Sequence, residues 1–173
     1  MSKRTGVLFV CLGNICRSPL GEGIFRHRVE AAGLGDRFEI DSSGTSGWHA
    51  GEAPDPGSVR VARARGIDIS GQRSRALTRE DLERFDVIVA MDASNRRNIL
   101  SLAGAGGAEA LRGRLWLMRN FEREEDGSGD DEGVPDPWGG GARGFEEVFE
   151  IVDRSCANLL TWIRRERGMG QGR

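Results

Sequence analysis

The chain has 173 residues, of which 38% are hydrophobic and 30% are charged, and its formal net charge is −2. This composition is that of one ordinary globular domain over residues 1–173, long enough to bury a core. A net charge so close to zero excludes general electrostatic attraction to nucleic acid.

The first predicted elements enclose a loop that suits phosphate. Apolar residues 7–10 predict a buried strand, and the pattern over 19–32 predicts a helix. Between them, unpaired backbone N–H groups and the positive end of the helix dipole converge on one place and favour an anion. The residues predicted to surround a phosphate are Leu12, Gly13, Asn14, Ile15, Cys16, Arg17 and Ser18.

Cys11 stands at the start of this loop and is the candidate nucleophile. Helix N-termini and cations favour the thiolate form of cysteine, which can attack phosphorus. Arg17 can hold two phosphoryl oxygens at once, and Ser18 can donate a hydrogen bond to the departing thiolate. The alternative is an ordinary buried cysteine beside a surface arginine.

The remaining elements alternate between strand and helix. In chain order we expect a strand over 38–42, helices over 58–65 and 78–83, a strand over 87–90, a helix capped by Ser94 that ends near 102, a strand over 114–118 and a helix over 145–165. This order predicts an α/β fold, a three-layer doubly wound sheet of four parallel strands with helices on both faces and the phosphate-binding loop after strand 1.

Two segments are expected to lie outside this framework. Residues 122–133 form an acidic, glycine-rich insertion that predicts a mobile loop, and residues from about 167 to 173 predict a flexible tail. The negative charge of the insertion either disfavours acidic phosphopeptides, or selects basic ones, or only adds solubility.

Residues 10–19, Val-Cys-Leu-Gly-Asn-Ile-Cys-Arg-Ser-Pro, resemble the signature loop of the low-molecular-weight protein tyrosine phosphatases. Shorter matches follow in the family's order: Asp41-Ser42, Thr45-Ser46-Gly47-Trp48, Phe85-Asp86, Met91-Asp92, Ser94-Asn95 and Asp136-Pro137. The resemblance implies hydrolysis of phosphotyrosine in a protein or peptide through a cysteinyl-phosphate, without cofactor or metal. No nucleic acid or membrane partner is expected, and the chain is expected to be a monomer or a weak homodimer.

The resemblance also assigns the general acid. A leaving alkoxide or phenoxide departs slowly unless it is protonated, so a carboxylic acid is needed near Cys11. Asp136 matches the family's acid, and its flanking prolines restrain the backbone. By itself, an Asp-Pro step would indicate a simple turn. Asp92 is the other carboxylate expected at this edge, and we expect it to be structural.

Three residues are expected to support the loop. Asn14 tolerates positive φ and can brace the loop through its amide. Ser42 resembles the family position that hydrogen-bonds this asparagine. The third position in the family's network is usually a histidine, and here the aligned residue is Gln72, which can donate and accept but cannot titrate.

Trp48 and Trp138 match aromatic positions that flank a phosphotyrosine ring, and Leu12 and Ile15 can line the base of the pocket. Such a slot favours an aryl phosphate, because phosphoserine is too short to reach its floor. Alternatively the two tryptophans belong to the core or a lid. The three glycines after Trp138 loosen that wall.

Three cysteines, an odd number, argue against a disulfide framework and give no zinc pattern. Cys11 and Cys16 share one loop, so oxidation could join them in a reversible disulfide; alternatively Cys16 only packs. Cys156 is expected in the core. The first residues lead into a strand without a long apolar segment, so neither secretion nor a membrane span is expected, and the expected location is cytoplasmic.

Other functions on the same loop remain open. A protein arginine phosphatase is the nearest, although that branch has a threonine where this chain has Ile15. An arsenate reductase would need a relay of further cysteines, which this chain lacks. A non-catalytic phosphate-binding module would not need cysteine, arginine and aspartate together.

Overall fold

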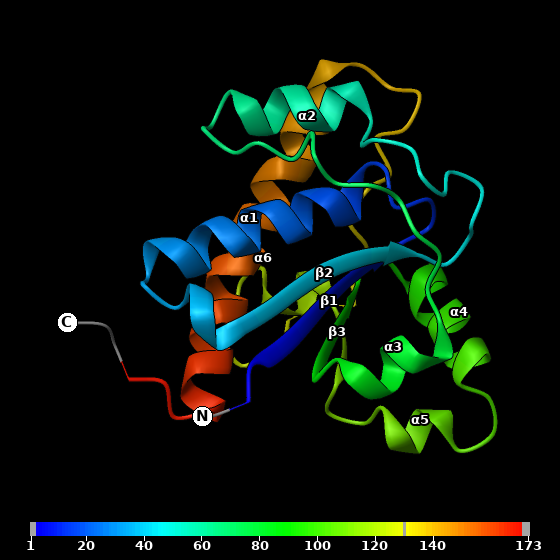
Figure 1. Ribbon diagram of the computed structural model, residues 1–173, viewed down its shortest axis with the longest axis vertical. Helices are drawn as coiled ribbons and strands as arrows, with labels where there is room; N and C mark the ends of the chain where they lie inside the picture. Colours follow the sequence, from blue (N-terminus) through cyan, green and yellow to red (C-terminus); the bar gives the residue numbers. More distant parts are fainter. Residues whose placement is uncertain (1–2, 130, 171–173) are drawn as a thin grey trace.

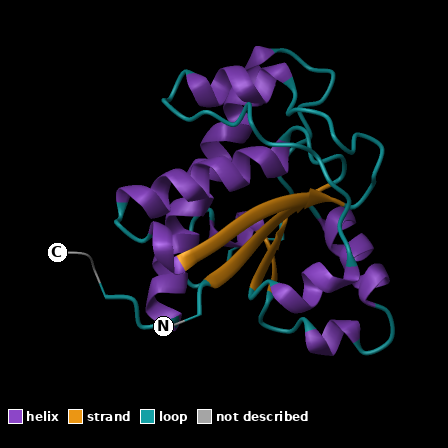
Figure 2. Ribbon diagram, in the orientation of Figure 1, coloured by secondary structure: helices purple, strands orange, loops and turns teal. Residues whose placement is uncertain are grey.

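A parallel four-stranded sheet forms the centre of the computed structural model, which describes residues 3–129 and 131–170. Its strands are β1 (Thr5–Cys11), β2 (Phe38–Gly44), β3 (Val87–Ala90) and β4 (Leu115–Leu117), in the order β2-β1-β3-β4. Figure 1 shows the strands running side by side, and in Figure 2 they lie between two groups of helices. The predicted three-layer α/β fold is confirmed.

Helices cover both faces of the sheet. On one face lie α1 (Arg17–Ala31), α2 (Pro56–Arg63) and α6 (Ala142–Glu166), and on the other lie α3 (Arg79–Arg84), α4 (Ala93–Ala103) and α5 (Gly107–Ala110). Two short 3-10 turns, η1 (Gly35–Arg37) and η2 (Met118–Phe121), precede β2 and follow β4. Because both faces are covered, β1 is buried along its whole length, which explains the unbroken apolar run over its residues 7–10.

The core has two parts, one on each side of the sheet. Phe9 of β1 points toward α1, where its ring lies 5.6 Å from that of Phe25, while Leu8 and Val10 point toward α3 and α4. Gly21 allows α1 to approach the sheet closely, because a Cβ there would lie 2.7 Å from the Phe9 ring. Cys156 is buried in the α6 side of the core, as predicted.

The ends of several helices differ from the predictions. Helix α1 begins at Arg17, with Cys16 as its N-cap, and α6 begins at Ala142. Helix α4 is capped by Asp92, not by Ser94: Asp92 Oδ1 accepts from the Asn95 N–H at 2.7 Å, and Asn95 Oδ1 accepts from the Asp92 N–H at 3.2 Å. The reciprocal capping box satisfies two otherwise free donors, and Ser94, two residues after the cap and already inside the helix, does not do so. Helix α5 was not predicted, because its Gly-Ala sequence lacks an apolar period.

The two peripheral segments are described only in part. Asp130 of the insertion and residues 171–173 of the tail lie outside the described residues. Met169 is 7% exposed and belongs to the core, and its N–H donates to the Arg164 carbonyl at 2.8 Å. The chain therefore stays attached to the fold beyond residue 167, where the tail was expected to begin, because this methionine finds an apolar site.

Candidate active site

The phosphate-loop candidate joins the last residue of β1 to the first turn of α1. Cys11 is buried at the floor, where its Sγ accepts from the Asn14 N–H at 3.3 Å and lies 3.0 Å from Ser18 Oγ. Asn14 has a φ of 56°, a left-handed conformation that no other described non-glycine residue adopts. This residue reverses the chain, so that the loop curls around the sulfur.

Neighbouring segments hold the outside of the loop. The backbone N–H of Thr45 donates to the Cys11 carbonyl at 2.9 Å, and the Ser74 hydroxyl donates to the Gly13 carbonyl at 3.0 Å. The carbonyls of Leu12, Ile15 and Cys16 accept from Ser46, Asp55 and Ser58. Carbonyls bound on the outside are the arrangement that lets backbone N–H groups converge on an anion above the Cys11 sulfur.

A chain of side-chain hydrogen bonds braces the loop from within. Asn14 Nδ2 donates to Ser18 Oγ at 2.8 Å and to Ser42 Oγ at 3.0 Å, and Ser42 donates to Glu22 Oε1 at 2.7 Å. A carboxylate only accepts, so Glu22 fixes the direction of the Ser42 hydrogen. Because Ser18 accepts from Asn14, its own hydrogen is left for one of two acceptors, Cys11 Sγ at 3.0 Å or the Ser43 carbonyl at 3.4 Å.

Gln72 does not take the third place in this network, contrary to the prediction. Its Nε2 donates to the Pro19 carbonyl at 3.1 Å, and its Oε1 is buried without a hydrogen-bond partner in the described structure. Glu22 takes that place and pairs with Arg26 at 2.7 Å. Sequence reasoning missed Glu22, although Ser18, Glu22 and Arg26 follow at the four-residue spacing that puts side chains on one helix face.

Arg17 is held in a fixed orientation by two acceptors. Its side chain is 4% exposed, and its NH1 donates to Asp92 Oδ2 at 2.7 Å and to the Val134 carbonyl at 3.0 Å. The second terminal nitrogen, NH2, lies 3.8 Å from Asp136 Oδ2. Asp92 thus both caps α4 and orients Arg17, which is the structural role expected of it.

Asp136 reaches the site from the segment before α6. Its side chain is about half exposed, and its Oδ1 accepts from the Trp138 N–H at 3.1 Å, which closes a local turn. This turn leaves Oδ2 directed toward the Arg17 guanidinium. The structure therefore brings Asp136 to the same pocket as Cys11, although 125 positions separate the two in the sequence.

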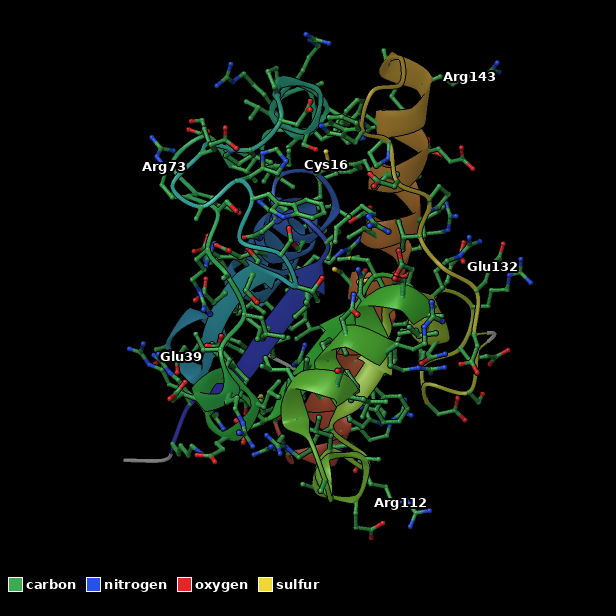
Figure 3. All side chains as sticks on the ribbon, turned by 90° about the vertical axis from the view of Figure 1, so that its right-hand side faces the viewer. Cys16, Glu39, Arg73, Arg112, Glu132 and Arg143 are labelled. Carbon is green, nitrogen blue, oxygen red and sulfur yellow. The ribbon has the colours of Figure 1, made fainter. Side chains whose placement is uncertain are left out.

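The predicted pocket residues meet around a cavity of about 170 Å³. It is lined by Cys11, Leu12, Gly13, Ile15, Cys16, Arg17, Trp48, His49, Asp136 and Trp138. Trp48 and Trp138 are 79% and 64% exposed, so these two tryptophans are walls and not core residues. Figure 3 looks onto this side of the molecule, with Cys16 in its upper half between Arg73 and Glu132.

Sequence reasoning missed His49. It follows Trp48 directly, pairs with Glu52, and packs so close to the loop that a Cβ on Gly13 would lie 3.0 Å from its ring. Its position one residue after a predicted wall residue was the available signal.

The pKa of Cys16 and a search for metal-binding side chains bear on the chemistry of the site. Burial raises the pKa of the Cys16 thiol well above its ordinary value, and the nearby carboxylates of Asp55 and Asp136 add to this rise. Among residues 3–129 and 131–170, no cluster of three or more His, Cys, Asp or Glu side chains suits a metal ion. In the same part of the chain, no helix has the length and apolar character needed to cross a membrane.

Comparisons with known proteins match nearly the whole chain. The family model described as "Low molecular weight phosphotyrosine protein phosphatase" matches residues 6–169. The low molecular weight protein-tyrosine-phosphatase YfkJ of Bacillus subtilis is 40% identical over 161 residues, which are 93% of this chain and 97% of that protein. A low molecular weight phosphotyrosine protein phosphatase from Schizosaccharomyces pombe is 43% identical over 157 residues, which are 90% of this chain and 95% of that protein.

Solved structures give the same result. The crystal structure of YfkJ superposes with a TM-score of 0.85 at 36% identity and covers 96% of this chain and 98% of that one. A protein tyrosine phosphatase from Entamoeba histolytica, with Hepes in its active site, has a TM-score of 0.82 at 32% identity, with 95% and 98% coverage.

Proposed function

Because the chain belongs to the low molecular weight phosphotyrosine protein phosphatase family, we propose that it hydrolyses phosphotyrosine in proteins or peptides through a cysteinyl-phosphate. One observation carries this proposal: the Cys11 sulfur lies at the floor of the loop between β1 and α1, in the same pocket as Arg17 and Asp136. A nucleophile, an oxyanion clamp and a general acid are thus present together.

In the first step the Cys11 thiolate attacks phosphorus, an S–P bond forms, and the bond from phosphorus to the phenol oxygen breaks. Protonated Asp136 gives its proton to that oxygen as it leaves. Arg17 holds two of the phosphoryl oxygens and binds them more strongly as negative charge gathers in the transition state. Since Asp92 and Val134 already fix the guanidinium, little reorganisation is needed.

In the second step water attacks the cysteinyl-phosphate. The Asp136 carboxylate accepts a proton from the water, an O–P bond forms and the S–P bond breaks, which releases phosphate. Ser18, at 3.0 Å from Cys11 Sγ, donates a hydrogen bond to the departing thiolate. The donor is oriented because Asn14 already donates to the Ser18 oxygen.

The walls of the pocket favour an aryl ester. Trp48 and Trp138 are the most exposed residues of the pocket lining, and Leu12 and Ile15, which are less exposed, line the same cavity. A phenyl ring can stack between such walls while its phosphate reaches the floor, whereas phosphoserine is too short.

Turnover of four substrates side by side tests this function. We expect kcat/KM for a phosphotyrosine peptide to exceed that for the matched phosphoserine peptide by at least about 100-fold, because the shorter ester cannot reach Cys11. Phosphoarginine and arsenate are the other two substrates. A preference for phosphoarginine would overturn the argument from Ile15. Reduction of arsenate would show that the chain is an arsenate reductase, and phosphate binding without turnover would indicate a non-catalytic binding module.

We also propose that Cys16 protects Cys11 from oxidation. A peroxide oxidises the Cys11 thiolate to a sulfenic acid; the Cys16 thiol then attacks that sulfur, an S–S bond forms, and water leaves. The raised pKa of Cys16 supports this order, because a protonated thiol is the poorer target for peroxide.

Reductive recovery after peroxide treatment checks this role. Each variant is compared with its own untreated rate after hydrogen peroxide and then dithiothreitol. Cys16→Ser should regain a smaller fraction than the wild type, because its sulfenic acid continues to the irreversible sulfinic acid. Cys156→Ser, the same change at a buried thiol in α6, should recover like the wild type. Equal recovery by all three proteins would refute the protective role.

The cellular setting is part of the same proposal. A cytoplasmic location is supported by the three cysteines, which are all free thiols in the structure and suit a reducing compartment. A monomer or weak homodimer that needs no metal or cofactor is proposed, with a phosphotyrosine protein or peptide as its partner.

A further inference from the structure

The acidic segment before Asp136 is bound to the body of the protein through arginines. Glu125 pairs with Arg165 at 3.0 Å, and Asp131 pairs with Arg96 at 3.7 Å. At the two ends of the segment, Glu122 and Glu132 both pair with Arg119. These carboxylates are directed toward the protein's own cations, so the segment has a role within the fold besides any effect on solubility.

Arg119 joins the beginning of this segment to its end. It lies in η2, and its side chain is 11% exposed. Its Nε donates to Glu122 Oε2 at 2.6 Å, while its NH1 donates to the Gly133 carbonyl at 3.0 Å and lies 3.2 Å from Glu132 Oε1. A planar guanidinium can serve acceptors on two sides at once, which an ammonium group cannot do with the same geometry.

Glu122 is a firm anchor for this arginine. Burial raises its pKa, but hydrogen bonds from Arg154 and Arg119 outweigh that effect and hold the pKa of Glu122 below its usual range. The carboxylate is therefore charged at neutral pH, and its second oxygen accepts from Arg154 at 2.9 Å.

The end of the segment leads directly to the acid. Gly133 is bound by Arg119, and the next residue, Val134, is bound on both sides: its N–H donates to the Met91 carbonyl at 2.8 Å and its carbonyl accepts from Arg17 at 3.0 Å. Gly133 also passes so close to α4 that a Cβ would lie 2.9 Å from Asp92 Cβ. The backbone two residues before Asp136 is thus fixed at several points.

We propose that Arg119 is a positioning residue for Asp136, an inference that rests on the proposed role of Asp136 as general acid. The Asp136 side chain is about half exposed, and its contacts are the local turn with Trp138 and the long pair with Arg17. Its placement therefore depends on the backbone that enters its loop. A general acid must lie within hydrogen-bond reach of the leaving oxygen, so a small shift of this backbone slows proton transfer.

Leaving-group dependence tests the inference. The quantity compared is kcat/KM, which reports departure of the phenol, for phenyl phosphate and for 4-nitrophenyl phosphate. Arg119→Ala should lower the value for phenyl phosphate by about 10-fold but the value for 4-nitrophenyl phosphate by less than about twofold, because a stable phenolate needs little protonation. Arg154→Ala is the matched control: it removes an arginine from Glu122 but none from Gly133, and it should leave both values unchanged.

A second variant, Arg119→Lys, tests the inference even if Arg119→Ala does not fold. Lysine keeps the charge but not the two-sided geometry, so kcat/KM should fall by a smaller factor, again only for phenyl phosphate. In the Asp136→Ala background, Arg119→Ala should cause no further slowing, because the group that it positions is gone.

The outcomes separate two failures. If Asp136→Ala slows both esters equally, the acid assignment fails, and this inference fails with it. If Asp136→Ala shows the expected selectivity but Arg119→Ala either behaves like Arg154→Ala or slows the double variant further, only the positioning role of Arg119 is overturned.

Discussion

Replacing Cys11 by serine should lower the turnover of phosphotyrosine peptides by more than about 1,000-fold, as expected when a covalent nucleophile is removed. A serine hydroxyl in the same place would have no base hydrogen-bonded to it: among the described residues, the groups hydrogen-bonded to the sulfur are the Asn14 N–H, which is a donor, and the Ser18 hydroxyl, which is itself an alcohol. The site stabilises an anion and does not generate one from an alcohol.

Cys156→Ser controls for the change from sulfur to oxygen. Cys156 is buried in α6 and takes no part in the pocket, so this variant should keep its activity. Rapid chemical quenching during turnover should trap phosphate on Cys11 in the wild type and in Cys156→Ser, and none in Cys11→Ser. Turnover by Cys11→Ser near the wild-type rate would exclude the cysteinyl-phosphate mechanism.

Replacing Asp136 by alanine should slow the first step according to the leaving group. For phenyl phosphate we expect kcat/KM to fall by about 100-fold, within the usual range for a general acid, and for 4-nitrophenyl phosphate by about tenfold or less. Asp136→Asn keeps the oxygen that accepts from the Trp138 N–H but has no acidic proton, so it should reproduce the alanine result.

Asp92 provides the matched comparison for this prediction. It is the other carboxylate beside Arg17, and its two oxygens already serve Arg17 and the cap of α4. Asp92→Asn should therefore slow both esters by a similar factor, because the loss is in the orientation of Arg17 and not in protonation of the phenol. Equal slowing of both esters by Asp136→Ala would overturn the acid assignment of Asp136, and selective slowing of phenyl phosphate by Asp92→Asn would assign that role to Asp92.

Much of the fold follows from local patterns. The buried strands over residues 7–10 and 87–90 read as short apolar runs because helices cover both faces of the sheet. The predictions of helix ends were less accurate. Asp92 and Ser94 are both good N-cap residues by type, and only the reciprocal hydrogen bonds between Asp92 and Asn95 distinguish them. Helix α5 has no apolar period at all.

The support of the site was harder to predict than its chemistry. Gln72 was expected in the Asn14 network because of its aligned position, yet its amide faces Pro19 and Glu22 binds Ser42 instead. Arg119 carries no motif of its own. Its relevance arises from bonds to residues on both sides of a long insertion, and a linear pattern does not encode such pairing.

The sequence by itself determined the phosphate loop, since Cys11, Arg17 and Ser18 lie within eight consecutive residues whose strand-to-helix context fixes their geometry locally. Only the tertiary structure decided what completes the site. The Arg17 side chain meets the Val134 carbonyl across 117 positions, and Ser42 meets Glu22 across 20. The physical reason is that these contacts depend on how separate elements pack on the sheet, which sets their distances and angles, whereas a contiguous loop carries most of its geometry in its own backbone.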